Sequence, residues 1–174
     1  ALLLFAIWIG LVAHAAPPPS DLVKPELLAD VSSIQPSKPF NLGVMKKMEP
    51  GWHTYWKNPG DSGAPTKISF TAPDGFTFDP IQFPTPIQFN QPGDIIGYGY
   101  TDEVMLIARI TPPASLKPGD SIDIKASASW LCCEAVCVPG HQSLSITLPA
   151  ANEASPANKE LFDKDTARQS MEGS

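Results

Sequence analysis

The sequence is short of basic residues and of cysteine. Its 174 residues include 12 Lys and Arg against 18 Asp and Glu, and the basic residues form no cluster. A net charge of -6 therefore argues against a nucleic-acid-binding protein. The sequence also lacks a recognisable glycine-rich phosphate loop, Ser-His-Asp arrangement or paired-carboxylate motif. We therefore expect no bound cofactor and no small-molecule substrate.

The first stretch, residues 1–12, lacks charge and is almost wholly apolar. Residues 13–15 (AHA) have the small-x-small pattern of a signal-peptidase site, and three prolines follow at 17–19. The run is too short for a membrane span, which needs about 20 residues. We expect residues 1–15 to be a truncated signal peptide and residues 16–26 to be a Pro-rich linker. The alternative for the apolar run is a buried core helix. Export would place the remainder in an oxidising compartment, where paired cysteines form a disulfide by default.

Twenty prolines and twelve glycines lie between short apolar runs with no repeat, which favours an all-β domain over a helical bundle. Strands are expected near residues 27–34, 40–48, 51–56, 66–70, 76–83, 97–110, 121–131 and 143–148, with an irregular loop at 84–93. This number of short strands predicts an immunoglobulin-like β-sandwich over residues 27–149. The pattern of residues 150–174 predicts a linker or a short helix. Ser155 would cap this helix, and Pro156 would lie in its first turn.

All three cysteines lie in residues 130–140 (WLCCEAVCVPG), which is the most chemically distinctive stretch of the chain. Residues four apart in a continuous strand are about 13 Å apart. A disulfide needs Cα atoms within roughly 7 Å, so Cys133 and Cys137 can pair only if the chain turns between them. The end of strand alternation at Cys132 and the following Pro-Gly pair predict such a turn. The strands on either side are then expected to form a hairpin.

Strand alternation separates the two adjacent cysteines. One face of the preceding strand carries Ile122, Ile124, Ala126, Ala128 and Trp130. Extending this face by two residues turns Cys132 inward, as a buried and inert thiol, and turns Cys133 outward as the reactive one. A β-bulge would exchange the two. Glu134 adjoins Cys133 without a Lys or Arg in the motif, and a carboxylate raises a thiol pKa, which favours a reducing pair.

Three functions are compatible with this stretch. The first is thiol-disulfide exchange, in which a short loop keeps the resolving thiol close. The second is an interaction module with a structural disulfide, although so short a closed loop gives little entropic stabilisation. The third is a copper carrier. Its candidate ligands are Cys132, Cys133, Cys137 and His141, with Met45, Met48 and His53 as further soft or borderline ligands.

Aromatic and histidine residues elsewhere are weaker candidates for a supporting role. His53 and Tyr55 share one face of a predicted strand. The opposite face, expected to be core, carries Trp52, Thr54 and Trp56. Tyr98 and Tyr100 are candidates to line the cysteine site, although aromatic residues in such strands usually pack.

Three segments, in this order, resemble the periplasmic N-terminal domain of the DsbD family of thiol:disulfide interchange proteins, in its ScsB-like branch. They are residues 51–63 (GWHTYWKNPGDSG), 97–100 (GYGY) and 130–139 (WLCCEAVCVP). The resemblance covers about residues 27–149, and residues 160–168 resemble the segment that comes after this domain in that branch.

The resemblance implies an immunoglobulin-like domain whose active cysteines are Cys133 and Cys137. It implies a membrane-embedded electron donor, in cis or in trans, and acceptors that are periplasmic thioredoxin-fold proteins or cytochrome c maturation factors. A cap loop shields the pair in relatives, and residues 89–96 are the corresponding segment. Cys132 departs from the family pattern, which has an aliphatic residue there, and could compete for Cys137. We predict that Cys137 meets the partner and that Cys133 resolves the mixed disulfide.

Overall fold

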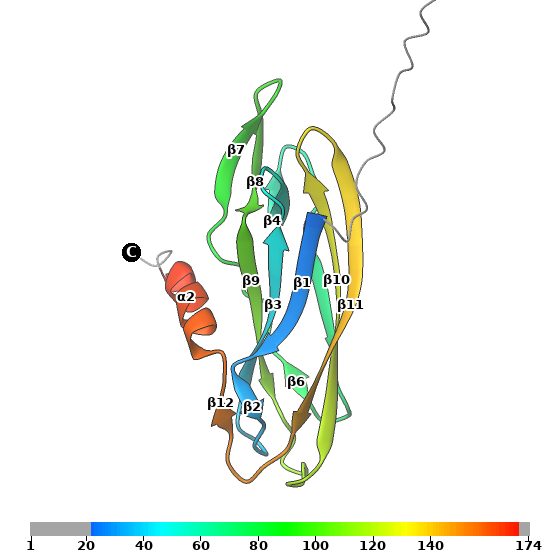
Figure 1. The fold of residues 1–174 in the computed structure, drawn as a ribbon, viewed down its shortest axis with the longest axis vertical. Coiled ribbons are helices and arrows are strands. Elements are labelled where there is room, and N and C mark those ends of the chain that lie inside the picture. The colour runs from blue at the N-terminus through cyan, green and yellow to red at the C-terminus, as the bar shows by residue number, and fades with distance from the viewer. Residues whose placement is uncertain (1–21, 171–174) are drawn as a thin grey trace, which may run out of the picture.

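A computed structural model describes residues 22–170 of the chain (Figure 1). The expected signal peptide therefore lies outside the described residues. The strands are β1 (Val23–Ala29), β2 (Val31–Ser33), β3 (Phe40–Met48), β4 (His53–Gly60), β5 (Lys67–Thr71), β6 (Thr77–Phe78), β7 (Ile87–Gln91), β8 (Ile95–Thr101), β9 (Glu103–Thr111), β10 (Ser121–Cys133), β11 (Cys137–Pro149) and β12 (Ser155–Pro156). One helix, α2 (Lys159–Ser170), comes after them. No helix among the described residues is long and apolar enough to cross a membrane.

The strands form two main antiparallel sheets. The first has the order β1-β3-β9-β6, and the second has the order β11-β10-β4-β8-β7, with β5 paired to β10. Apolar side chains from both sheets fill the space between them, including Val44 and Leu106 from the first and Ile124, Ala126 and Trp130 from the second. This arrangement confirms the predicted immunoglobulin-like β-sandwich.

The sandwich begins earlier than the sequence pattern indicates. Strand β1 starts at Val23, which is fully buried, so the sheet includes residues that the pattern assigns to the Pro-rich linker. Pro25 lies within this strand, paired with Lys46 of β3. Because β1 is an edge strand, it can accommodate a proline that has no N–H to donate.

The stretch predicted as an irregular loop, residues 84–93, contains strand β7. It pairs with β8 to form a hairpin, from Ile87 opposite Gly99 to Gln91 opposite Ile95. The prediction of a loop was wrong because Pro84, Pro86 and Pro92 flank the strand and do not interrupt it. This hairpin stands at the end of the sandwich that carries the β10–β11 turn (Figure 1).

The expected C-terminal helix is present, but it begins later than predicted. Ser155 and Pro156 form β12 and pair with β2, so Ser155 does not cap the helix. Helix α2 covers the outer face of the first sheet through Phe162, which is 4% exposed and packs with Met45, Met105 and Ile107. This helix lies on the opposite side of the first sheet from the main core (Figure 1).

Strand β10 brings three other strands to the cysteines. It pairs with β11 along its whole length, with β5 over residues 125–129, and with β4 only at its last two residues. There Cys132 lies opposite Thr54, and Cys133 lies opposite His53. Because alternation continues without a bulge, these two cross-strand pairs occupy opposite faces of the sheet.

Candidate functional site

Cys133 and Cys137 form a disulfide at the end of the β10–β11 hairpin. Their Cα atoms are 4.1 Å apart, and the N–H of Glu134 donates to the carbonyl of Val136 at 3.0 Å across the turn. The predicted turn and hairpin are therefore confirmed. The two halves of the disulfide differ in access, because Cys137 is exposed and Cys133 is 1% exposed.

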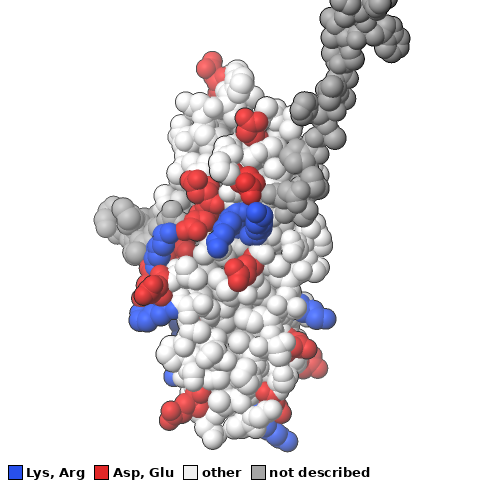
Figure 2. All heavy atoms as spheres, viewed as in Figure 1, with Lys and Arg blue, Asp and Glu red and all other residues white. Residues whose placement is uncertain are grey.

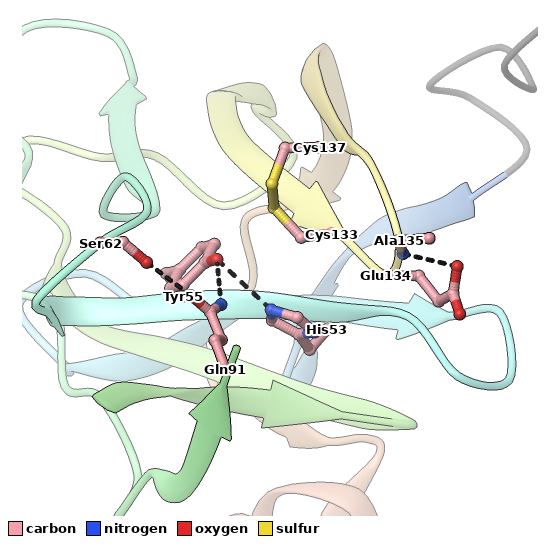
Figure 3. Close-up of a disulfide and its surroundings, with 8 residues drawn as sticks. All are labelled: His53, Tyr55, Ser62, Gln91, Cys133, Glu134, Ala135 and Cys137. Carbon is pink, nitrogen blue, oxygen red and sulfur yellow. Dashed lines mark hydrogen bonds between the residues drawn. A yellow bond between two sulfur atoms is a disulfide. The ribbon is translucent and has the colours of Figure 1, made fainter. Parts of the chain in front are cut away.

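The predicted exposure of Cys133 was wrong, although its predicted face was right. Cys132 faces the core and Cys133 faces the other way, as alternation indicates. Cys133 is nevertheless buried, because β4 and the β7–β8 hairpin stand beside that face of β10 and enclose it (Figure 3). Alternation alone assigns a face, and it carries no information about what covers that face.

A cavity of about 580 Å³ opens beside the disulfide, and both Cys133 and Cys137 lie in its wall. Its apolar wall includes Ile87, Phe89, Ile95 and Leu131, and its polar wall includes His53, Tyr55, Gln91 and Glu134. Glu134 is the one charged side chain among the lining residues, and it lies exposed at the rim with its Oε2 accepting the N–H of Ala135. A reacting group that enters the cavity therefore meets the disulfide without a Lys or Arg beside it.

A chain of hydrogen bonds ties the β7–β8 hairpin to β4 beneath the disulfide (Figure 3). The amide Nε2 of Gln91 donates to Tyr55 Oη at 3.0 Å, and Ser62 Oγ donates to Gln91 Oε1 at 2.6 Å. His53 Nε2 lies 3.4 Å from the same Tyr55 Oη, and the His53 and Phe89 rings are 4.3 Å apart. The predicted cap segment thus does lie against the site, through Phe89 and Gln91.

Two glycines leave room for the aromatic rings of this site. A Cβ at Gly97 would lie 2.3 Å from Phe89, and one at Gly63 would lie 2.3 Å from the Tyr55 ring. Gly63 also has a φ of +95°, a conformation that glycine adopts without strain. The resemblance gave residues 89–96 as the cap segment but singled out neither Phe89 nor Gln91. Ser62 was missed from the sequence, because nothing local signals that the β4–β5 loop meets β7 at the cysteines.

The core side of the same strands holds a separate polar cluster. Lys46 is fully buried, and its Nζ donates to Thr54 Oγ1 and Thr66 Oγ1, both at 2.9 Å. Burial lowers the pKa of Lys46 to about 7, although the nearby Cys132 opposes this shift. Burial raises the pKa of Cys132 to about 11. Cys132 is therefore a neutral free thiol at ordinary pH, on the face away from the disulfide.

Lys46 was also missed, although a signal was present. It continues the inward-facing series Phe40, Leu42 and Val44 on β3, and all of these residues are buried. A lysine in register with a core face indicates a buried amine.

Tyr98 and Tyr100 do not line the cavity. On β8 the positions that pair with the site residues of β4 are Thr101, opposite His53, and Gly99, opposite Tyr55. The two tyrosines alternate with these positions and so face away from the disulfide. The Tyr100 hydroxyl donates to the carbonyl of Pro84 at 2.6 Å. Their proposed place beside the cysteines was wrong because glycine and threonine occupy that face.

The ligands proposed for copper are dispersed in the structure. Cys132 lies in the core, and His141 is exposed, with its Nε2 3.0 Å from Ser127 Oγ. Met45 packs under α2. Within residues 22–170, no three His, Cys, Asp or Glu side chains are grouped so that they could hold a metal ion.

Charged side chains are distributed unevenly over the surface. In the view of Figure 2, basic side chains lie around the middle and lower part of the molecule, and the end that carries the β7–β8 hairpin shows acidic and uncharged residues. The exposed apolar side chains Val136 and Ile87 lie at this end, 52% and 47% exposed. In this view (Figure 2), the end with the β7–β8 hairpin therefore shows no Lys or Arg.

Comparisons with known proteins give a matching family and similar solved structures. A family model described as thiol:disulfide interchange protein DsbD, N-terminal, matches residues 20–149. The N-terminal periplasmic domain of ScsB from Proteus mirabilis has a similar structure, with a TM-score of 0.62 at 24% identity, and the match covers 89% of this chain and 57% of that chain. The N-terminal domain of DsbD from Neisseria meningitidis, in the reduced form, matches with a TM-score of 0.45 at 17% identity, over 81% of this chain and 95% of that chain. No curated protein matches the sequence.

Proposed function

Because this chain belongs to the family of N-terminal domains of the thiol:disulfide interchange protein DsbD, we propose that it is a thiol-disulfide exchange domain whose redox pair is Cys133 and Cys137. The observation that carries the proposal is the position of the disulfide. It lies in the wall of an open cavity, with Cys137 exposed and Cys133 buried. A partner thus has access to the sulfur of Cys137, while the sulfur of Cys133 is shielded from the partner.

The same position argues against a purely structural disulfide. The bond closes a turn of three residues at the end of a hairpin that already pairs thirteen residues of β10 with β11. The stabilisation that a disulfide gives through loop closure is smallest for short loops. Exposure of one sulfur beside a cavity contributes nothing to stability, but exchange requires it.

The exchange reaction has two steps when the domain acts as reductant. The Cys137 thiolate attacks a partner disulfide, which forms a mixed disulfide and releases one partner thiolate. The Cys133 thiol then loses its proton and attacks Cys137 Sγ, which restores the domain disulfide and releases the second partner thiolate. The domain loses two electrons and the partner gains them.

The proposed partners derive from family membership. The domain receives electrons from a membrane-embedded reductase domain, in cis or in trans, and passes them to thioredoxin-fold proteins in the periplasm. It would thereby act as a component of a protein-disulfide reductase. In this proposal residues 1–15 direct export.

Mixing the reduced protein with an oxidised thioredoxin-fold protein tests this function. We expect the domain thiols to be lost and partner thiols to be gained in equal number, as measured by alkylation and mass spectrometry. A domain that stays reduced against a panel of oxidised thioredoxin-fold proteins would contradict the proposal. Cys132→Ala serves as the background, since it removes the third thiol without touching the pair.

Gln91→Ala is expected to make the disulfide more reactive. It removes the hydrogen bonds that hold the β7–β8 hairpin to Tyr55 and Ser62. We expect reduction of the disulfide by dithiothreitol to be several times faster, with a loss of about 1 kcal/mol in the free energy of unfolding. Gln88→Ala is the matched control, because Gln88 is an exposed β7 residue outside the cavity wall. Equal rates in the two variants would show that the hairpin does not limit access.

A further inference from the structure

The cavity offers few groups that could exchange a proton with the buried sulfur. Cys133 is 1% exposed, so bulk water has little access to it. The resolving step nevertheless requires Cys133 to lose a proton before it attacks. Of the side chains in the cavity wall, His53, Tyr55 and Glu134 are the titratable ones besides the two cysteines. The side chains that β7 and β8 contribute to the cavity wall carry no titratable group.

Geometry favours His53 among these three. It is the residue directly across from Cys133 in the β4–β10 pairing, and side chains in such a pair have Cβ atoms about 5 Å apart on the same face. Glu134 is exposed at the rim, and its carboxylate already accepts the N–H of Ala135. Tyr55 lies two residues further along β4, opposite Gly99, and its hydroxyl accepts a hydrogen bond from Gln91.

We propose that His53 is the group that takes the proton from the Cys133 thiol when the mixed disulfide at Cys137 is resolved. The inference rests on the exchange function proposed above. In this step the imidazole accepts the thiol proton, Cys133 Sγ forms a bond to Cys137 Sγ, and the bond from Cys137 to the partner sulfur breaks. The electron pair of that bond leaves with the partner thiolate.

Contacts around the ring fit this role. With the proton on Nε2, His53 donates toward Tyr55 Oη, which also accepts from Gln91, so both lone pairs of this oxygen are used. Nδ1 then has a free lone pair for the proton of Cys133. Phe89 packs on the imidazole at 4.3 Å and fixes its plane. Burial also lowers the pKa of His53, so the imidazole is neutral and able to accept a proton at neutral pH.

A single-turnover reaction separates the two steps. Reduced protein in the Cys132→Ala background is mixed with one equivalent of dithiobis(nitrobenzoate), whose thiolate product is coloured. Attack by Cys137 releases the first thionitrobenzoate, and resolution by Cys133 releases the second. The pH profile of the second release is compared between the wild-type sequence at position 53, His53→Gln and His53→Phe, which keeps a ring against Phe89.

We expect the second release to rise with pH through a His pKa below 6.5 and then to level off when His53 is present. In both variants we expect it to be about tenfold or more slower near pH 7, and to keep rising toward the pKa of the thiol. The first release should be unchanged, because Cys137 is exposed and reacts without His53.

Two results would overturn the inference. One is an unchanged second release in His53→Gln and His53→Phe, and the other is slowing in the Gln variant alone, which would assign His53 a packing role. If neither variant folds, the pH profile of the second release in the protein that keeps His53 decides. A profile that shows no His pKa would then overturn the inference. Failure of the proposed function looks different, because the reduced domain would then stay reduced against oxidised thioredoxin-fold proteins, whatever the pH profile of the second release.

Discussion

Cys133→Ser is expected to stop turnover and to accumulate a mixed disulfide at Cys137 when the reduced domain meets an oxidised thioredoxin-fold protein. Cys137 is the exposed half of the pair and Cys133 the buried half. Without Cys133 nothing expels the partner from Cys137, so the intermediate persists. We expect the steady-state rate of partner reduction to fall at least about a thousandfold, with the adduct visible on a non-reducing gel and mapped by mass spectrometry.

Cys137→Ser is the matched variant and should behave differently. It leaves Cys132 and Cys133, which are both buried, so we expect neither turnover nor a stable adduct. Cys132→Ala should retain turnover, because Cys132 lies on the core face and does not meet the disulfide. An adduct at Cys133 in the Cys137→Ser variant would reverse the proposed order, and loss of turnover in Cys132→Ala would contradict the separation of the two faces.

The free energy of unfolding should rise with pH between about 6 and 9 because of Lys46. Burial lowers the pKa of this lysine from its ordinary value of 10.5, which applies to the unfolded chain, to about 7 in the folded protein. Between these values the unfolded chain binds a proton that the folded protein does not, so raising the pH favours the folded state. Integrated over pH 6 to 9, the rise is on the order of 2–3 kcal/mol.

Cys132 acts in the opposite direction at higher pH. Its pKa rises from 9.0 to about 11 on folding, so the folded protein keeps a proton that the unfolded chain loses in this range. Above about pH 9 this opposes the contribution of Lys46, and stability should stop rising. Denaturation by urea at a series of pH values, with the disulfide oxidised, measures both effects.

Lys46→Met should abolish the rise and stabilise the protein at pH 6 by about 1–4 kcal/mol. Methionine fills a similar volume, and the two threonine hydroxyls keep other acceptors. Thr66 Oγ1 donates to the Tyr55 carbonyl at 2.9 Å, and Thr54 Oγ1 lies 3.9 Å from Met48 Sδ. Lys38→Met is the control at an exposed lysine and should keep the rise. A flat profile in the unmodified protein would show that Lys46 is not buried as a neutral amine.

Local patterns account for the features that were predictable. The alternation that ends at Trp130 turned Cys132 inward and Cys133 outward, and the structure confirms both faces because β10 has no bulge there. The hairpin between β10 and β11 was inferred from alternation on both sides of the cysteines. These inferences hold because strand period and turn composition are properties of neighbouring residues.

Features formed by distant segments were not predictable in this way. The burial of Cys133 depends on β4 and on β7, which lies more than forty residues away in the chain. The prolines around β7 concealed a strand, and with it the contacts that Phe89 and Gln91 make to His53 and Tyr55. Tyr98 and Tyr100 were misplaced because composition does not reveal which face of β8 meets the site.

The reduction potential of the Cys133–Cys137 pair tests the central claim most directly. Equilibration with glutathione or thioredoxin buffers in the Cys132→Ala background would give its value. An exchange domain should have a potential in the range of about -180 to -270 mV, in which thioredoxin-fold partners and glutathione also operate. A value below about -300 mV would identify a structural disulfide that resists exchange, and would contradict the assignment of this pair as a redox site.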